Sequence, residues 1–175
     1  MFDLVTLSMH DALKFNPDAA FAMISITSEE DVDFPDLPNR LGLLRLHFYD
    51  EDRYTEHRPP MSYLQAAKAW SFIHRYYRQV EVIALHCLAG YSRSPAMAAA
   101  IDEALDIYGD NRWFRDYSPN MHVYRTMLNT IKFYDEVIEG FIKKGIDLKA
   151  EGIATNIFFH QSPSTMKGAI ANGTA

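Results

Sequence analysis

The chain has 175 residues, enough for one domain with a sizeable core, and its hydrophobic share of 48% is ordinary for a globular protein. It carries 17 Lys and Arg against 23 Asp and Glu, a formal net charge of −6. This acidic balance disfavours nucleic acid as a bulk partner, since such binders usually carry basic patches, and the single cysteine excludes an internal disulfide.

The first part of the chain predicts two strands joined through a short helix. Residues 4–9 are expected to form the first strand, and a helical piece over residues 11–15 is expected to end before Pro17, whose ring cannot continue a helix. The apolar run 21–26 is typical of a buried strand. The acidic, proline-bearing segment 28–40 predicts a loop.

The middle of the chain predicts a further strand, a helix and another strand. Residues 43–48 alternate apolar and polar side chains and so predict a third strand. Ser62 followed by Gln65 predicts a capping box at the start of a helix over residues 63–77. The apolar run 80–85 predicts a central strand.

The last part of the chain is expected to be helical. Alanine-rich residues 94–108 predict a helix that ends at Gly109–Asn111, and Asn120 is expected to cap the next one. Apolar residues at helical spacing then predict one core-facing stripe, formed by Tyr124, Met127, Leu128, Ile131, Tyr134, Ile138 and Phe141. Strands alternating with helices predict an α/β fold, a central mostly parallel sheet with helices on both faces.

The sequence predicts a domain over residues 1–145 and a C-terminal extension over 146–175. Residues 157–159, Ile-Phe-Phe, are too apolar to be solvated and should dock on the domain. The end of the chain from Ser162 is rich in Ser, Gly, Ala and Thr, which predicts mobility.

One short segment, the run from His86 to Ser94, carries most of the chemical information. It contains the only cysteine, Cys87, at the end of the predicted central strand and just before a predicted helix. Arg93 follows six positions later, with Ser94 next to it. A strand, a tight loop and a helix in this order form an anion site with a nucleophile at its floor.

The loop chemistry predicts a reactive thiolate and a bound phosphate. The backbone N–H groups of the loop and the positive end of the following helix both favour negative charge, which predicts a lowered pKa for the Cys87 thiol. Arg93 offers a planar fork to phosphate oxygens, Ser94 can donate to the sulfur, and Gly90 lets the backbone approach a ligand. The expected phosphate-binding residues are Leu88, Ala89, Gly90, Tyr91, Ser92 and Arg93. The competing interpretation is a buried, inert core cysteine.

These residues resemble the H-C-x-x-G-x-x-R-S signature of the cysteine-dependent protein phosphatases, and most closely the small dual-specificity branch with H-C-x-A-G-x-S-R-S. The matching positions are His86, Cys87, Ala89, Gly90, Ser92, Arg93 and Ser94. A Pro119–Asn120 step before the last core helix is a second, weaker point of resemblance. His86 is expected to support the loop, by hydrogen bonding its backbone and tuning the thiolate.

The resemblance also implies a general acid, an aspartate on a loop after a strand some thirty residues before the cysteine. The family pattern aligns Leu46 and Phe48 with Asp50, which makes Asp50 the first choice for the acid and Asp52 the reserve. The segment 53–61 is a few residues longer than usual there. A merely solvated acidic loop is the competing interpretation.

The resemblance implies a phosphatase that hydrolyses phosphotyrosine, and also phosphoserine or phosphothreonine, in proteins through a phosphocysteine intermediate. The expected partner is therefore a phosphorylated protein or peptide. Alternatives are a non-catalytic phosphopeptide-binding module and a phosphatase for phosphoinositides or RNA 5′-phosphates, although loop positions 88, 89, 91 and 92 hold no lysine. A thiol–arsenate reductase would need additional cysteines.

We expect no cofactor and no metal site, because the arginine and the loop N–H groups carry the charge that a metal would otherwise neutralise. The histidines show no metal-ligand spacing. A reactive thiolate fits a reducing, cytoplasmic compartment, and the sequence has no signal-peptide pattern and no apolar window long enough to span a membrane.

Overall fold

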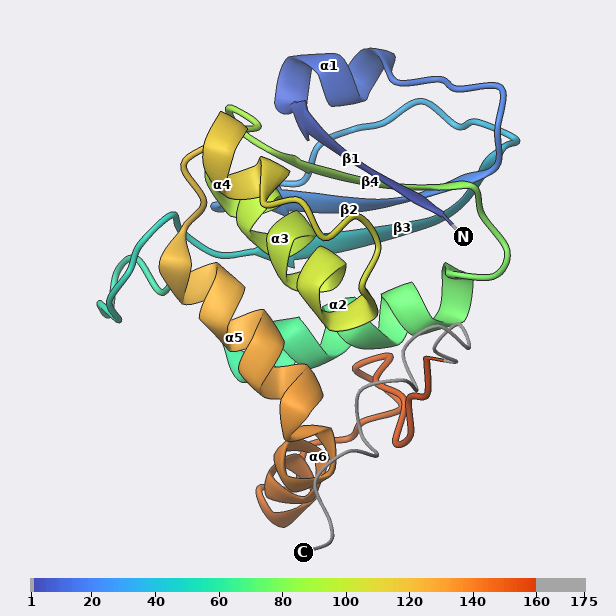
Figure 1. The fold of residues 1–175 in the computed structure, drawn as a ribbon. Coiled ribbons are helices and arrows are strands. Elements are labelled where there is room, and N and C mark those ends of the chain that lie inside the picture. The colour runs from blue at the N-terminus through green and yellow to red at the C-terminus, as the bar shows by residue number, and fades with distance from the viewer. Residues whose placement is uncertain (1, 160–175) are drawn as a thin grey trace, which may run out of the picture.

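A four-stranded sheet in which every neighbouring pair of strands is parallel organises the chain (Figure 1). The computed structural model describes residues 2–159. The strands, in their spatial order, are β1 (Asp3–Ser8), β4 (Val82–Cys87), β2 (Phe21–Thr27) and β3 (Arg40–His47). The predicted α/β fold with a parallel sheet is confirmed, and β4, which carries the cysteine, is an interior strand.

The two faces of the sheet are covered very differently. Helices α2 (Tyr63–Tyr76) and α3 (Arg93–Leu105) cover one face, and α5 (Met121–Lys132) packs against both of them (Figure 1). The main core lies in this layer, around the fully buried Trp70. Helix α1 (Met9–Lys14) and apolar residues of the loop after β2 cover the other face, which has a smaller core around Phe21 and Phe34.

Local capping signals place the helix starts as predicted. Ser62 and Gln65 form both bonds of the capping box that opens α2. The Asn120 side chain accepts a hydrogen bond from the Val123 N–H at the start of α5. These bonds satisfy backbone donors that have no partner inside the helix.

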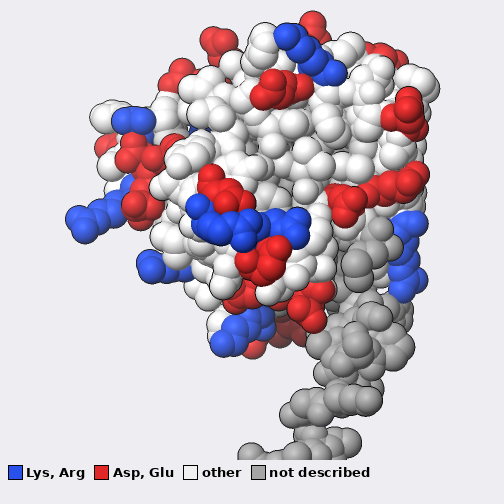
Figure 2. All heavy atoms as spheres, turned by 45° about the horizontal axis from the view of Figure 1, so that its top comes forward, with Lys and Arg blue, Asp and Glu red and all other residues white. Residues whose placement is uncertain are grey.

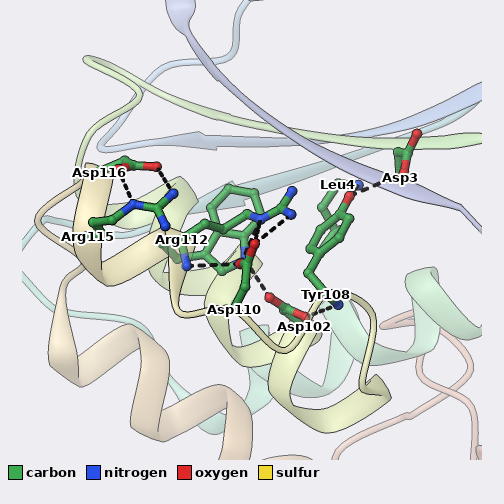
Figure 3. Close-up of polar contacts among 9 residues, drawn as sticks. Asp3, Leu4, Asp102, Tyr108, Asp110, Arg112, Arg115 and Asp116 are labelled. Atoms are coloured by element: carbon green, nitrogen blue, oxygen red, sulfur yellow. Dashed lines mark hydrogen bonds and ion pairs between the residues drawn. The ribbon is translucent and has the colours of Figure 1, made fainter.

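Helix α3 ends earlier than predicted, at Leu105 rather than at Tyr108, because Asp106 takes a left-handed backbone with φ of 51°. Buried Asp102 holds the turn that follows (Figure 3). Its carboxylate accepts from the Tyr108 N–H at 2.8 Å and from Trp113 Nε1 at 2.9 Å, which fixes the short helix α4 (Arg112–Asp116).

The predicted single stripe after Asn120 is divided between two helices, which corrects the sequence prediction. Helix α5 ends at Lys132, Phe133 leaves helical geometry with φ of −120° and ψ of 41°, and α6 (Tyr134–Lys143) follows. The Tyr134 hydroxyl lies 3.0 Å from the Ser71 hydroxyl of α2, which anchors the new helix. The buried residues of α5 include Val123, Thr126 and Thr130, which the stripe omitted.

The segment after α6 returns to the main core. Leu148 and Ile153 are buried, and Phe159 packs edge-on against Trp70 at 5.7 Å between ring centroids. Of residues 157–159, which the sequence predicts to dock, Ile157 and Phe159 are partly buried against the main core, whereas Phe158 is 71% exposed. The mobility predicted from Ser162 onward concerns residues outside the described part. Between residues 2 and 159, none of the helices has the length and apolar character needed to cross a bilayer.

Candidate active site

The carboxyl edge of the sheet gathers the residues that the sequence singled out. The parallel register pairs Ser8 with Cys87, and Thr27 with His47, so all four strands end at this edge. Ligands of such sheets bind beyond the carboxyl ends of the strands. The loop after β4, the segment after β3 that holds Asp50, and the start of α5 meet here.

Cys87 is a buried thiol surrounded by donors, with 2% of its surface exposed. Burial raises its pKa, and the Ser94 hydroxyl, which donates to the sulfur at 3.3 Å, opposes this most strongly. Backbone N–H groups of Ser94, Ser92 and Gly90 add to the same effect. The net result is a pKa below the ordinary value for cysteine, so the donors favour the thiolate.

The loop turns back on itself at Gly90, which has φ of +70°. A Cβ at this position would lie 2.6 Å from backbone atoms of Leu7 and Ser8. The sequence predicts that Gly90 lets a ligand approach the backbone. The structure gives a second reason for glycine: a side chain here would collide with the backbone where β1 meets α1. The Met9 N–H donates to the Leu88 carbonyl at 3.2 Å and holds the same contact.

The other expected phosphate-binding residues lie along this turn with different exposures. The side chains of Leu88 and Tyr91 are 65% and 54% exposed, and Ala89 is also exposed. The Tyr91 carbonyl accepts from the Ser118 N–H at 3.2 Å. The loop is therefore held from both sides while two of its large side chains remain at the surface.

Arg93 is a buried cation that no described carboxylate neutralises. It is 4% exposed, and its Nη1 donates to the Phe48 carbonyl at 2.7 Å and to the Ser28 hydroxyl at 3.3 Å. Its Nε has no partner among the described residues. An arginine is charged at any physiological pH, so an unpaired donor on a buried guanidinium marks a place for an anion.

Asp50 is joined to the cysteine loop, and the reserve Asp52 is not. Asp50 Oδ1 accepts from the Ser92 hydroxyl at 2.9 Å and from Asn120 Nδ2 at 2.8 Å. Asp52 lines a neighbouring groove that also contains Arg53. The contacts therefore favour Asp50 over Asp52 as the residue that acts together with the loop.

Asn120 is the site residue that sequence reasoning missed, because it was assigned only to capping. It is 7% exposed and performs three tasks. Its Oδ1 caps α5, its Nδ2 donates to Asp50, and its backbone N–H donates to the Ser92 carbonyl at 3.3 Å. The Pro119–Asn120 step was the available signal. Sequence alone does not show that Asp50, seventy positions away along the chain, is adjacent to Asn120 in space.

His86 is buried under the loop and is uncharged at neutral pH. Burial lowers its pKa to about 4, the nearby Cys87 backbone opposes this, and the Arg93 charge lowers it further. Its Nε2 lies 2.8 Å from the Ser25 hydroxyl of β2, and the Phe34 ring packs edge-on against it. Its Nδ1 has no hydrogen-bond partner among the described residues, so the expected bond to the loop backbone is not formed and the partner of the ring is a side chain on the next strand.

Comparisons with known proteins do not assign this chain to a family. No family model matches the chain, and no curated protein matches it. Within residues 2–159 no group of three or more His, Cys, Asp or Glu side chains is arranged to hold a metal ion. The case for a function therefore depends on the site residues themselves.

Proposed function

We propose that the protein is a cysteine phosphatase that hydrolyses phosphotyrosine monoesters in proteins, and also phosphoserine or phosphothreonine esters. One observation carries the proposal: the buried thiol of Cys87, to which the Ser94 hydroxyl donates, and the buried guanidinium of Arg93, whose Nε has no partner among the described residues, belong to one loop at the carboxyl edge of the sheet. A phosphate group fits both, because it offers an electrophilic phosphorus to the sulfur and oxygens to the arginine.

In the first proposed step the Cys87 thiolate attacks phosphorus. A sulfur–phosphorus bond forms while the ester oxygen–phosphorus bond breaks. Asp50 gives its proton to the departing oxygen, and Oδ2 is the atom suited to carry it, because Oδ1 accepts from Ser92 and Asn120. Arg93 and the loop N–H groups stabilise the charge on the remaining phosphate oxygens.

In the second proposed step water attacks the phosphocysteine. The Asp50 carboxylate takes a proton from the water, a new oxygen–phosphorus bond forms, and the sulfur–phosphorus bond breaks. Inorganic phosphate and the Cys87 thiolate are released. The Ser94 hydroxyl, 3.3 Å from the sulfur, stabilises the thiolate as it leaves.

The proposal is tested with para-nitrophenyl phosphate and a phosphotyrosine peptide, using the unaltered chain and Cys87→Ser. We expect turnover by the unaltered chain and a loss of about 10³-fold or more in the variant, which should still bind the peptide in calorimetry. Acid quenching during turnover should trap one phosphoryl group on Cys87. Peptide binding by both proteins without turnover would instead indicate a phosphopeptide-binding module.

A further inference from the structure

A groove beside the proposed active site, of about 750 Å³, has no part in the chemistry described above. It lies between the segment after β3, the start of α2 and the first turns of α5. Its lining includes Asp52, two residues after Asp50, and Met121, which directly follows Asn120. We call it the acid-loop groove. It begins next to the residues that hold the proposed general acid.

The acid-loop groove contains two arginines that are available to a ligand. Arg53 and Arg125 both line it and are exposed, and neither makes a salt bridge within residues 2–159. Nearby Arg58, in contrast, pairs with Glu51 at 2.9 Å. Asp52 is the one carboxylate among the described lining residues. A chain with a net charge of −6 thus presents a local excess of positive charge here.

The rest of the lining suits a peptide. Tyr54 and Tyr63 are 76% and 46% exposed, and tyrosine is enriched where proteins bind one another because it offers apolar area together with a hydroxyl. The Asn129 side chain adds donors and acceptors for a backbone. The groove volume falls in the range of pockets that hold ligands.

We propose that the acid-loop groove binds acidic residues that flank the phosphorylated residue of a protein substrate, with Arg53 and Arg125 pairing to Asp or Glu side chains. This inference rests on the proposed phosphatase function and names its substrate class. Guanidinium groups suit carboxylates because they form two parallel hydrogen bonds. Two arginines in a groove suit isolated carboxylates better than an anionic membrane, which favours clusters of several Lys and Arg.

The surface charge agrees with a local site of this kind. Figure 2 shows basic side chains interspersed with acidic ones on the face that it presents, with no wide area of either sign. That face carries no wide basic area that would attract acidic peptides over a long range. The proposal therefore depends on short-range pairing at Arg53 and Arg125.

The test compares two phosphotyrosine peptides of equal length, one with Glu on both sides of the phosphotyrosine and one with every Glu replaced by Gln. The value of kcat/KM is measured for the unaltered chain, Arg53→Gln, Arg125→Gln, the double variant, and Arg78→Gln as a matched control near the end of α2, outside the groove. Para-nitrophenyl phosphate measures the basal chemistry of each.

We expect kcat/KM of the unaltered chain to be about tenfold higher for the acidic peptide than for the Gln peptide. Each single variant should reduce this ratio by about threefold, and the double variant should have equal kcat/KM for the two peptides. Arg78→Gln should keep the preference. All variants should have a kcat for para-nitrophenyl phosphate within about twofold of that of the unaltered chain. Neither Arg53 nor Arg125 forms a hydrogen bond with Cys87, Arg93 or Asp50.

Equal kcat/KM for the two peptides, or a preference that survives in the double variant, would overturn the groove proposal while leaving the phosphatase intact. If no phosphate ester is turned over, the phosphatase proposal fails, and fluorescence anisotropy of the same peptides with Cys87→Ser still decides the groove. Binding that depends on both arginines but requires vesicles containing anionic lipid, rather than the acidic peptide, also overturns it.

Discussion

Asn120 Nδ2 donates to Asp50 Oδ1 at 2.8 Å, and this bond joins the segment after β3 to the first turn of α5. The Asn120 backbone N–H also reaches the Ser92 carbonyl of the cysteine loop. One buried amide therefore sets the position of the proposed acid relative to the proposed nucleophile. Asn120 is a positioning residue in this scheme, since it contacts Asp50 and the loop but not the reacting atoms.

Asn120→Ser should separate positioning from capping. Serine is as good a helix cap as asparagine, but it lacks the longer amide donor, so we expect the free energy of unfolding to change by less than about 1 kcal/mol while kcat falls roughly tenfold. Urea unfolding and para-nitrophenyl phosphate turnover measure the two effects. A kcat that stays within about twofold of that of the unaltered chain would show that Asn120 acts only as a helix cap.

Ser94→Ala should raise the pKa of the Cys87 thiol, since the Ser94 hydroxyl is the strongest of the groups that lower it. The rate of alkylation by iodoacetamide as a function of pH reports this pKa, and the single cysteine allows whole-protein mass to be used. The alkylation midpoint should shift to higher pH. An unshifted midpoint would show that the backbone donors alone hold the thiolate.

Ser92→Ala is the matched control for that experiment. The Ser92 side chain donates to Asp50, whereas only its backbone N–H serves the sulfur. We therefore expect the alkylation midpoint of Ser92→Ala to stay where it is in the unaltered chain. Its effect should appear instead in kcat for para-nitrophenyl phosphate, because it removes a hydrogen-bond donor to Asp50.

Asp50→Asn and Asp52→Asn should differ sharply if Asp50 is the proton donor. Removal of a general acid costs about 10²- to 10⁴-fold, so kcat for a poor leaving group should fall by that order in Asp50→Asn and the basic limb should disappear. Asp52→Asn should remain within about threefold of the unaltered chain. A lost basic limb in Asp52→Asn alone would reverse the assignment.

Much of this site follows from local sequence, because local signals suffice for its parts. The Ser62–Gln65 box, the Asn120 cap and the strand–loop–helix order around Cys87 all depend on neighbours within a few positions, and each is found as expected. Asp50 was aligned by a short strand pattern and lies against Ser92 in the structure.

The parts that sequence did not reveal depend on contacts between distant segments. The Asn120–Asp50 bond spans seventy positions, and no local pattern encodes it. The early end of α3 depends on Asp102 reaching Trp113, and the break at Phe133 accompanies a contact between Tyr134 and Ser71. The helical spacing of apolar residues continues through such a break, so the spacing does not reveal that the chain changes direction there.

His86 should make stability depend on pH in a defined window. Its pKa is about 4 in the folded chain against an ordinary 6.5, so the unfolded state binds the extra proton between these values. Its contribution is therefore fully present above about pH 6.5, is lost as the pH falls towards 4, and amounts to roughly 3 kcal/mol. Urea unfolding at several pH values measures it.

His86→Gln isolates this effect, since it removes the titrating ring. The variant should be less stable at pH 7 but should lose less stability between pH 6.5 and 4 than the unaltered chain. Asp110, whose pKa Arg112 lowers to about 2, titrates below this window and does not interfere. Parallel curves for the two proteins would exclude a buried neutral His86 as the cause.

Gly90→Ala and Gly140→Ala should have opposite effects, although each adds a single methyl group. At Gly90 the added Cβ meets the Leu7 and Ser8 backbone at 2.6 Å, and a positive φ strains any L-residue, so we expect a loss of about 3 kcal/mol or more together with most of the activity. At Gly140, in α6, the Cβ has nothing within 4 Å, and alanine should stabilise the helix by about 0.5–1 kcal/mol. Thermal unfolding and para-nitrophenyl phosphate turnover measure both. A fully active Gly90→Ala would mean that the loop does not require its contact with the end of β1.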